Sequence, residues 1–323
     1  MEKNSRIFIA GHTGLAGSAI HRALEARDYS NLLLRTHAEL DLTDRNATRV
    51  FFNRERPEYV FLAAAKVGGI LANDTYPADF IRENIEIETS VIDASYHSGV
   101  KRLLFLGSSC IYPKHAPQPI KEEYLLAGPL EPTNRAYALA KIAGIEMCWS
   151  YNRQYGTRYL AAMPTNLYGP GDNFDLKASH VLPALMRKVV EAKLAGEKKL
   201  VVWGTGRPRR EFLYSDDLAE ACLHLLNLPE DRYKSLITEG EAPLINIGTG
   251  EDLTIRELAL LVSKVLELKC DLEFDTSRQD GTPQKLLDVS RINALGWKAK
   301  VSLEEGIRRT YESVRSQLEP IRG

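Results

Sequence analysis

The chain has 323 residues, of which 44% are hydrophobic and 26% are charged, and its formal net charge is -1. This length and composition suit one large domain or two coupled domains around a substantial buried core. The near balance of charge argues against a broad surface for nucleic acid or for an anionic membrane.

The cysteines are widely spread along the chain, at Cys110, Cys148, Cys222 and Cys270. They form no C-x-x-C pair and have no clustered histidine partners, so we expect neither a disulfide framework nor a metal site. The N-terminal segment lacks the basic and apolar regions of a secretion signal, and no stretch is long enough to span a bilayer. We therefore expect a protein of the cytoplasm.

Short apolar segments alternate with longer helical patterns through the first half of the chain. The expected strands cover residues 6–11, 32–36, 59–65, 101–109 and 159–170, and the expected helices cover 17–29, 45–57, 73–99 and 133–156. This alternation predicts an α/β fold with a doubly wound parallel sheet of the Rossmann type.

The alternation becomes irregular beyond Pro170, where strand and helix patterns are mixed. The segment 244–250 is an exception, because its apolar run predicts a buried strand that returns to the main sheet. We therefore expect a dinucleotide-binding domain from residues 1–168 plus a returning segment near 216–250. Residues 169–215 and 251–323 should form a smaller mixed α/β domain that binds the substrate.

A glycine-rich turn joins the first expected strand to the first expected helix, with Gly11, Gly14 and Gly17 in the stretch IFIAGHTGLAGSAI. Glycines at this spacing allow a tight turn and a close approach of backbone N–H groups to a pyrophosphate. The stretch predicts a dinucleotide site. Arg35, at the end of the second strand, favours the 2′-phosphate of NADP over the free hydroxyl of NAD, although a solvated surface arginine is the alternative.

Tyr137 and Lys141 are four residues apart in an expected helix, so both side chains lie on one face. We expect the lysine cation to favour the phenolate and to lower the pKa of Tyr137 into the range of an acid–base catalyst. The spacing Y-x-x-x-K is common by chance, and a surface tyrosine beside a solubilising lysine is the alternative.

The stretch GSSCIYP follows the fourth expected strand, at the edge of the sheet where open α/β folds bind ligands. Side chains alternate along a strand, so we expect Ser108 and Cys110 to point the same way and Ser109 to point away. Ser108 would then bind a substrate carbonyl with Tyr137. Cys110 could act as a base on the neighbouring carbon if a nearby cation favours its thiolate, whereas the alternative is a small buried hydrophobic residue.

These residues resemble those of extended short-chain dehydrogenases/reductases that act on nucleotide sugars. More narrowly, the chain resembles the GDP-L-fucose synthase family over nearly its whole length, through segments such as AAAKVGGILANDTYPADFI, LLFLGSSCIYPK, EPTNRAYALAKIAGI, SHVLPALMRK and DGTPQKLLDVSR. The resemblance implies 3,5-epimerisation of GDP-4-keto-6-deoxy-D-mannose, followed by reduction of the 4-keto group with NADPH to give GDP-L-fucose.

The same resemblance implies roles for individual residues. Cys110 is the base of the epimerisation and His180 the acid, while Tyr137, Ser108 and Lys141 serve the keto oxygen and the reduction. The residues implied for the cofactor are Gly11, His12, Thr13, Gly14, Leu15, Ala16, Gly17, Arg35, Lys141, Pro164, Asn166, Leu167 and His180.

Lys188, Trp203, Arg210 and Asp280 are implied for the GDP part of the substrate. Members of the family often carry arginine where this chain has Thr13 and His37, which leaves Arg35 as the main support for NADP. The resemblance also implies a homodimer through the helices near 80–97 and 134–154, and the charge balance leads us to expect no nucleic acid or membrane partner.

Two other functions fit parts of the pattern. An NAD-dependent nucleotide-sugar 4-epimerase or dehydratase would use the serine, tyrosine and lysine but would have no need of Cys110 and His180. A catalytically silent NADP-binding regulator could share the fold, although Ser108, Tyr137 and Lys141 are all present together.

Overall fold

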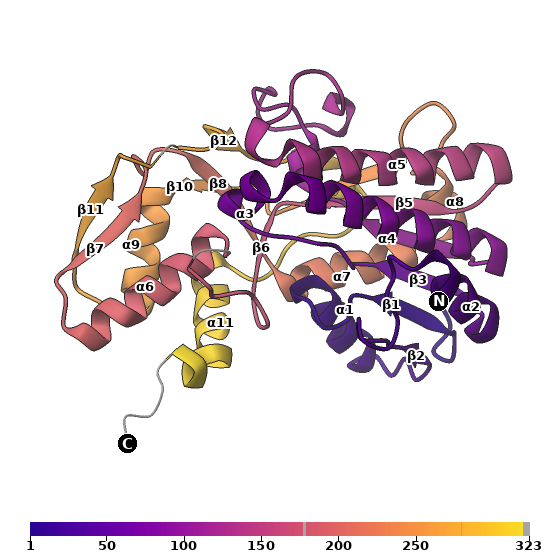
Figure 1. Cartoon of the computed structure of the whole chain (residues 1–323), viewed down its shortest axis with the longest axis horizontal. Coiled ribbons are helices and arrows are strands. Elements are labelled where there is room, and N and C mark those ends of the chain that lie inside the picture. The colour runs from indigo at the N-terminus through magenta and orange to yellow at the C-terminus, as the bar shows by residue number, and fades with distance from the viewer. Residues whose placement is uncertain (177–178, 279, 319–323) are drawn as a thin grey trace.

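The structure is a computed structural model that describes residues 1–176, 179–278 and 280–318. Its larger part is a six-stranded parallel sheet in the order β2-β1-β3-β4-β5-β9 (Figure 1). The strands are β1 (Ile7–Ala10), β2 (Leu32–Leu33), β3 (Tyr59–Leu62), β4 (Arg102–Leu106), β5 (Tyr159–Pro164) and β9 (Leu244–Ile247). The expected doubly wound α/β fold is confirmed.

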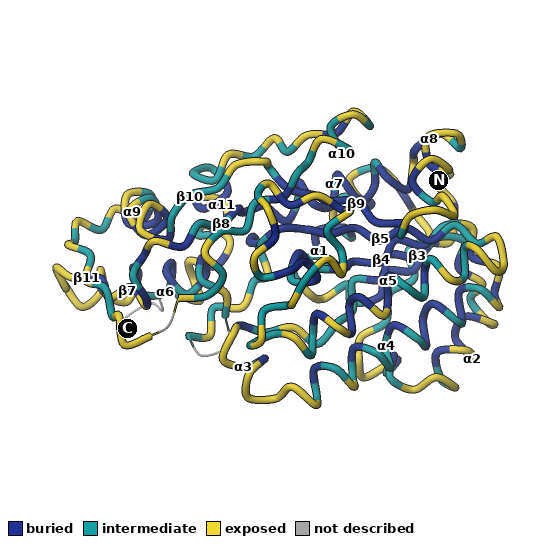
Figure 2. The backbone as a smooth tube through the Cα atoms, turned by 90° about the horizontal axis from the view of Figure 1, so that it is seen from above, coloured by how far each residue is buried: buried dark blue, intermediate teal, exposed yellow. Residues whose placement is uncertain are grey.

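Helices cover both faces of this sheet because its strands are apolar on both sides. Ile7 and Ile9 of β1 pack into one core with α1 and α7, and Phe8 packs into a second core with α2, α4 and α5. Figure 2 shows the buried strands between more exposed outer helices. These helices are α1 (Leu15–Glu25), α2 (Arg45–Glu55), α4 (Pro77–Ser98), α5 (Arg135–Tyr155) and α7 (Ser215–Leu226).

Strand β9 comes from the second half of the chain. It pairs in parallel with β5, with Ala161 opposite Leu244 and Pro164 opposite Ile247. The predicted return of residues 244–250 to the main sheet is therefore confirmed.

The smaller part lies at the left of Figure 1 and has its own apolar core. One of its sheets contains β6 (Asn166–Tyr168), β8 (Arg209–Tyr214), β10 (Asp252–Thr254) and β12 (Gln284–Lys285), and a second pairs β7 (Lys199–Trp203) with β11 (Asp271–Asp275). The helices around them are α6 (Val181–Ala195), α9 (Ile255–Val265) and α11 (Leu303–Leu318). Short helices complete the chain: α3 (Ile70–Thr75), α8 (Glu230–Lys234), α10 (Ser290–Ala294), η1 (Ser109–Ile111), η2 (Glu122–Tyr124) and η3 (Pro132–Asn134).

Two expected elements are divided in the structure. The expected strand 159–170 is wrong as a single element, because β5 pairs within the large sheet and β6 pairs with β8 of the small one. Between them the hydroxyl of Thr165 donates to the carbonyl of Glu211. The expected helix 73–99 is interrupted at Tyr76, which precedes Pro77 and so disfavours helical backbone.

The division of the chain into a dinucleotide-binding and a substrate-binding domain, with the boundaries given above, stays a prediction. Residues 319–323 at the end of the second domain lie outside the described residues. Within the described ranges, no helix has both the length and the apolar character needed to cross a membrane.

Glu211, in β8, joins the two parts. Its carboxylate is fully buried and accepts the backbone N–H groups of Thr249, Gly250 and Leu287 at 2.6, 2.8 and 2.9 Å. Three N–H donors are the partners that a buried carboxylate needs. The loop after β9 and the segment after β12 are thereby fixed to the same strand.

We expect Glu211→Gln to lower the free energy of unfolding by roughly 2 to 4 kcal/mol. The substitution replaces one acceptor oxygen with an NH2 donor, which would leave a backbone N–H group without its hydrogen bond. Urea denaturation of the two proteins measures this difference. Glu251→Gln is the control, since this exposed side chain should change stability by less than about 0.5 kcal/mol. Equal stability of Glu211→Gln and the original chain would contradict the role given to Glu211.

Candidate active site

The turn after β4 brings Ser108 and Cys110 together. Ser108 is the N-cap of η1, and its Oγ accepts the backbone N–H of Cys110 at 3.3 Å and lies 2.7 Å from the Cys110 Sγ. The prediction that these two side chains point the same way is confirmed. The predicted reason is wrong, because the strand ends at Leu106 and the short helix, not strand alternation, sets the direction.

Tyr137 lies in the first turn of α5, next to this pair. Burial raises its pKa well above the usual value, and the charges of Cys110 and Glu88 act in the same direction, whereas a hydrogen bond with Ser108 lowers it. The expected lowering of this pKa is therefore wrong. Tyr137 is held as a neutral phenol, the form that can donate a proton.

Lys141 makes its closest contact with a carboxylate that the sequence did not suggest. Its Nζ lies 3.1 Å from Oε1 of Glu88 in α4, and 5.8 Å from the centre of the Tyr137 ring. Glu88 occupies the apolar stripe of α4, four residues after buried Asn84 and three before buried Val91. A charged residue at a core position of a helix is the sequence feature that could have identified Glu88.

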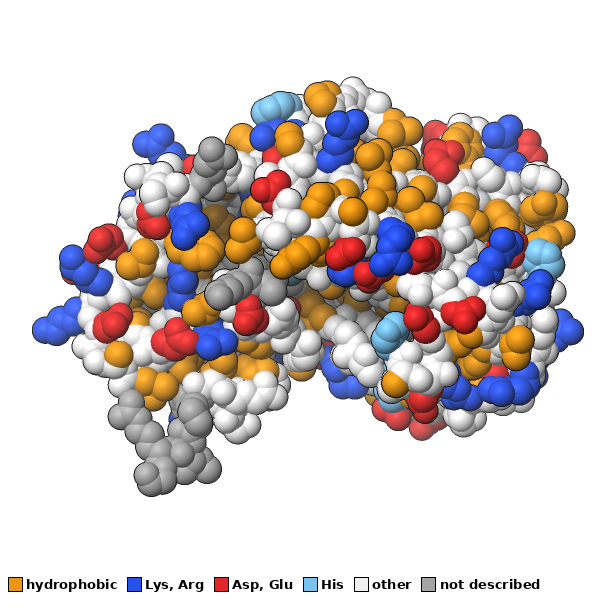
Figure 3. Space-filling model, viewed as in Figure 1, with side chains coloured by type: hydrophobic (Ala, Val, Ile, Leu, Met, Phe, Trp, Pro, Cys, Tyr) orange, Lys and Arg blue, Asp and Glu red, His pale blue; other side chains and the backbone are white. Residues whose placement is uncertain are grey.

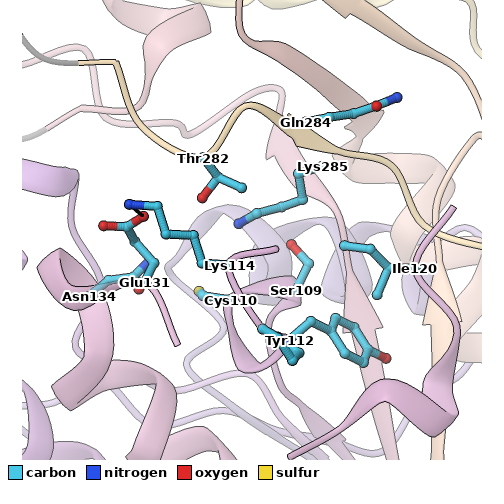
Figure 4. Close-up of a pocket in the computed structure, with 11 residues that line it drawn as sticks. Ser109, Cys110, Tyr112, Lys114, Ile120, Glu131, Asn134, Thr282, Gln284 and Lys285 are labelled. Carbon is cyan, nitrogen blue, oxygen red and sulfur yellow. Dashed lines mark ion pairs between the residues drawn. The ribbon is translucent and has the colours of Figure 1, made fainter. Parts of the chain in front are cut away.

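Lys285, in β12, is a second missed residue. It lines a cavity with Cys110, Ser109 and Lys114, and Figure 4 shows its amino group directed toward the turn that carries Cys110. Burial lowers the pKa of Lys285, and attraction to the Cys110 thiolate opposes this. Lys285 therefore provides the nearby cation that a cysteine base requires.

His180 immediately precedes α6, and the charge of Lys285 acts on it electrostatically. Burial lowers the pKa of His180, and the positive charge of Lys285 lowers it further. His180 is an exposed residue by its surface area, but the protein around its ring removes enough water to disfavour the imidazolium. The structure thus connects His180 electrostatically to the cavity that contains Cys110.

The glycine turn has the geometry of a phosphate-binding loop. Gly11 has a φ of 83°, and a Cβ on Gly17 would lie 2.1 Å from the carbonyl oxygen of Gly11. Helix α1 begins after Gly14 without a side-chain cap and has no acidic residue in its first turn. Its positive end is therefore open to an anion.

The remaining residues predicted for the cofactor are spread over three elements. His12, Thr13, Leu15 and Ala16 belong to the glycine turn and α1, Pro164 ends β5, and Asn166 and Leu167 begin β6. Asn166 donates to the carbonyl of Glu211 at 2.7 Å. Arg35 follows β2, where its guanidinium pairs with Glu55 at 3.1 Å, so its role toward a 2′-phosphate stays a prediction.

The residues predicted for GDP form two groups in the smaller part of the chain. The ammonium of Lys188 lies 4.6 Å, and the guanidinium of Arg278 4.9 Å, from the centre of the Trp203 ring, which is 49% exposed. An aromatic ring beside two cations suits a flat base next to phosphates. Arg278 was not suggested by the sequence.

The second group contains Arg210 and Asp280. Arg210 is the register partner of Lys285 between β8 and β12, so two cations lie side by side. Asp280 is already engaged, because its carboxylate accepts the N–H and hydroxyl of Thr205 at 2.9 and 2.6 Å. Figure 3 shows the hollow that separates the smaller part of the molecule from the larger one.

A family model decides the classification of the chain. The NAD dependent epimerase/dehydratase family matches residues 7–247, from β1 to the end of β9. The chain belongs to this family. The match covers both the glycine turn and the residues around Tyr137.

Within this family, the chain is similar to curated GDP-L-fucose synthases. It is 56% identical to GDP-L-fucose synthase 1 of Arabidopsis thaliana, a match that covers 96% of this chain and 93% of the relative. It is 54% identical to GDP-L-fucose synthase of Escherichia coli K12, with 95% of each chain covered.

Two solved structures show the same fold with the cofactor. A GDP-L-fucose synthetase from Naegleria fowleri bound to NADP is 27% identical, with a TM-score of 0.86 over 100% of this chain and 98% of that one. MlghC, a GDP-mannoheptose C4 reductase from Campylobacter jejuni with NADP bound, is 42% identical, with a TM-score of 0.86 over 98% and 99% of the two chains.

The glycine turn of this family member fits a dinucleotide. The uncapped start of α1 suits a pyrophosphate, and Nδ1 of His12 is buried without a hydrogen-bond partner among the described residues. Gly17 lies so close to Gly11 that a side chain at position 17 would not fit, and the loop stays open. No group of three or more His, Cys, Asp or Glu in the described part of the chain is arranged to hold a metal ion.

We expect Gly17→Ala to weaken NADPH binding by about tenfold or more, which corresponds to about 1.4 kcal/mol of binding free energy. The added Cβ would displace the carbonyl of Gly11 and so deform the loop. Titration of NADPH fluorescence measures the affinity. Gly240→Ala is the control, because no atom lies within 4 Å of the Cβ that it adds. Unchanged affinity in Gly17→Ala would place the cofactor elsewhere.

Proposed function

We propose that the chain converts GDP-4-keto-6-deoxy-D-mannose to GDP-L-fucose, by epimerisation at the two carbons beside the ketone and reduction of the 4-keto group with NADPH. The observation that carries this proposal is the meeting of Ser108, Cys110 and Tyr137 at one end of the sheet, with Lys285 directed toward Cys110. The similarity to curated GDP-L-fucose synthases over 95–96% of the chain supports it.

Epimerisation requires removal of a proton beside the ketone and its return on the opposite face. Cys110 is the base, and the ammonium of Lys285 stabilises its thiolate. Hydrogen bonds from Ser108 and Tyr137 stabilise the enolate that forms on the keto oxygen.

His180 returns the proton in this scheme. Because burial lowers its pKa, the free enzyme holds its imidazole mostly neutral at neutral pH. The two phosphates of the substrate would bring negative charge toward the cations of the smaller part of the chain, Lys188, Arg210 and Lys285. This charge favours the imidazolium of His180, so the acid becomes available when substrate is bound.

Tyr137 and the cofactor carry out the reduction in this scheme. NADPH, when bound, supplies the hydride that reduces the ketone. Tyr137 donates its hydroxyl proton to the keto oxygen, and its raised pKa keeps that proton in place until the transfer.

A reductase without epimerase activity is a second candidate, because MlghC is a C4 reductase and is 42% identical to this chain. The presence of Cys110 and Lys285 in the lining of one cavity favours the bifunctional enzyme, since reduction alone needs neither residue. The alternatives of an NAD-dependent 4-epimerase or dehydratase and of a silent regulator leave this pair without a role.

Incubation with GDP-4-keto-6-deoxy-D-mannose and NADPH in deuterated water tests the proposal. NADPH oxidation with deuterium at both carbons beside the ketone is the expected result. Oxidation without deuterium would show a simple reductase, and the absence of both signals would exclude this substrate. An NAD-dependent 4-epimerase would instead retain NAD through purification.

We expect Cys110→Ser to slow this deuterium exchange on the order of 100-fold while NADPH affinity is retained. Lys285→Met should slow it about tenfold or more, because the thiolate loses its neighbouring cation. Lys114→Met is the matched control: this lysine lines the same cavity, but Glu131 pairs with it at 2.9 Å. Exchange at the original rate in Cys110→Ser would remove this residue from the mechanism.

We also propose a cytoplasmic homodimer that associates through α4 and α5. These helices lie side by side, and Tyr96, Tyr151 and Tyr155 form an aromatic cluster between them, with Tyr155 45% exposed. Exposed aromatic surface on two adjacent helices suits a helix-to-helix contact.

A further inference from the structure

The strand that carries Lys285 is short and lies at the edge of its sheet. β12 contains two residues and is the last strand in the order β10-β8-β12. Its register partners are all in β8, where Lys285 lies opposite Arg210, so two cations are neighbours. A two-residue edge strand that pairs on one side leaves its outer backbone groups in need of other partners.

The backbone next to Lys285 forms hydrogen bonds in two directions. On the inner side, the carbonyl of Pro283 accepts the N–H of Arg209 at 2.8 Å. The N–H of Leu287 donates to the carboxylate of Glu211 at 2.9 Å. These odd-numbered residues therefore face β8, and the even-numbered residues between them face the other way.

Gln118 occupies the outer side of β12 with its side-chain amide. Its Nε2 donates to the carbonyl of Gln284 at 3.3 Å, and its Oε1 accepts the N–H of Leu286 at 2.8 Å. Lys285 is the residue between these two. The N–H of Ile120 donates to the carbonyl of Leu286 at 2.7 Å and continues the pairing. The carboxamide of Gln118 thus takes the place of a strand backbone on both sides of Lys285.

The loop that carries Gln118 starts at Cys110. Residues 112–120 follow η1 directly, and near their start the hydroxyl of Tyr112 donates to buried Asn246 of β9 at 2.6 Å. The cavity shown in Figure 4 is lined by Cys110 and Tyr112 from this loop and by Lys285 from β12. Gln118 is not one of the described residues that line it. Its side chain therefore acts on the backbone of β12 and not on the contents of the cavity.

A fixed position matters for Lys285 because more than one anionic group attracts it. Burial lowers the pKa of Lys285, whereas attraction to Cys110 and to Glu131 raises it. Both of these residues line the cavity. A lysine has a long side chain with many rotamers, so the place of its backbone limits which group its ammonium can reach.

We propose that Gln118 is a positioning residue for the epimerisation: its carboxamide fixes the backbone on both sides of Lys285 and so holds the ammonium beside Cys110. This inference rests on the proposed function, since it concerns the base that removes the proton beside the ketone. The energy between two charges falls with their distance, so a lysine on a loose edge strand would stabilise the thiolate less.

The first test needs neither substrate nor cofactor. Cys110 is alkylated at low salt with iodoacetate, an anion, and with iodoacetamide, a neutral reagent of similar size, and its peptide is quantified by mass spectrometry. The ratio of the two rates reports positive charge beside Cys110, because the amount of thiolate affects both rates alike. Gln118→Met removes both hydrogen bonds at similar volume and should lower this ratio about threefold, and Lys285→Met should lower it at least as much. Cys270, beside Ser263 in the smaller part of the chain, is the internal reference.

The double variant shows whether Gln118 acts through Lys285. In a chain that already carries Lys285→Met, Gln118→Met should change the ratio no further. Asn152→Leu is the matched control, because Asn152 also holds backbone, accepting the N–H of Tyr159 at 2.9 Å and donating to its carbonyl at 2.8 Å. This contact lies at the start of β5, at the opposite end of the strand from the site. The control should lose stability without a change in the ratio.

The second test is deuterium exchange into GDP-4-keto-6-deoxy-D-mannose with NADPH left out. Gln118→Met should slow this exchange by about threefold to tenfold, and by no more than Lys285→Met does. Its affinity for NADPH, measured by fluorescence, should be retained, because Gln118 is remote from the glycine turn in the chain.

An unchanged alkylation ratio in Gln118→Met would overturn the inference. So would a further fall of the ratio in the double variant, or an equal fall in Asn152→Leu, which would show a general effect of lost stability. If the original protein exchanges no deuterium into this substrate, the proposed function is rejected, whereas the alkylation ratio still decides whether Gln118 holds Lys285 at Cys110.

Discussion

The buried carboxylate of Glu211 is the interaction on which the shape of the site depends. It accepts backbone N–H groups from the loop after β9 and from Leu287, and its own carbonyl accepts hydrogen bonds from Thr165 and Asn166. One residue therefore fixes the point where the chain passes between the large and the small sheet. Arg210 precedes Glu211 in β8, and Lys285 of β12 is its register partner. Glu211 therefore also fixes the position of these two cations in the small sheet.

In the proposed mechanism, this site separates two kinds of proton transfer. Lys285 reaches Cys110 from the small sheet, and its charge supports a base. Lys141 lies 5.8 Å from the centre of the Tyr137 ring and is paired with buried Glu88, which balances its charge. Among the described residues, Lys141 has a buried carboxylate partner whereas Lys285 lines the cavity of Cys110, so the two lysines have different surroundings at one site.

The local features of this molecule could be predicted from its sequence. The glycine turn, the spacing of Tyr137 and Lys141, and the return of β9 all depend on patterns within one segment, and the alternation of elements identifies the parallel sheet. The break at Thr165 could not be predicted, because the residues on both sides of it read as strand and only their pairing partners differ. Glu88 and Lys285 were missed for a related reason. Their importance comes from neighbours 53 and 175 residues away in sequence, Lys141 and Cys110, and no local pattern records such a contact.

The pairing of β9 with β5 also has a consequence for how the chain is made. The edge strand of the main sheet is supplied only after the segment that contains β6, β7 and β8 has been synthesised. When the first 168 residues have been synthesised, β5 is therefore an unpaired edge of the sheet, and its pairing with β9 requires closure of a loop of about 80 residues, a slow step for parallel strands. An unpaired edge strand is a template for pairing with other chains during that interval, and a gene fragment that ends before Leu244 cannot encode the complete six-stranded sheet.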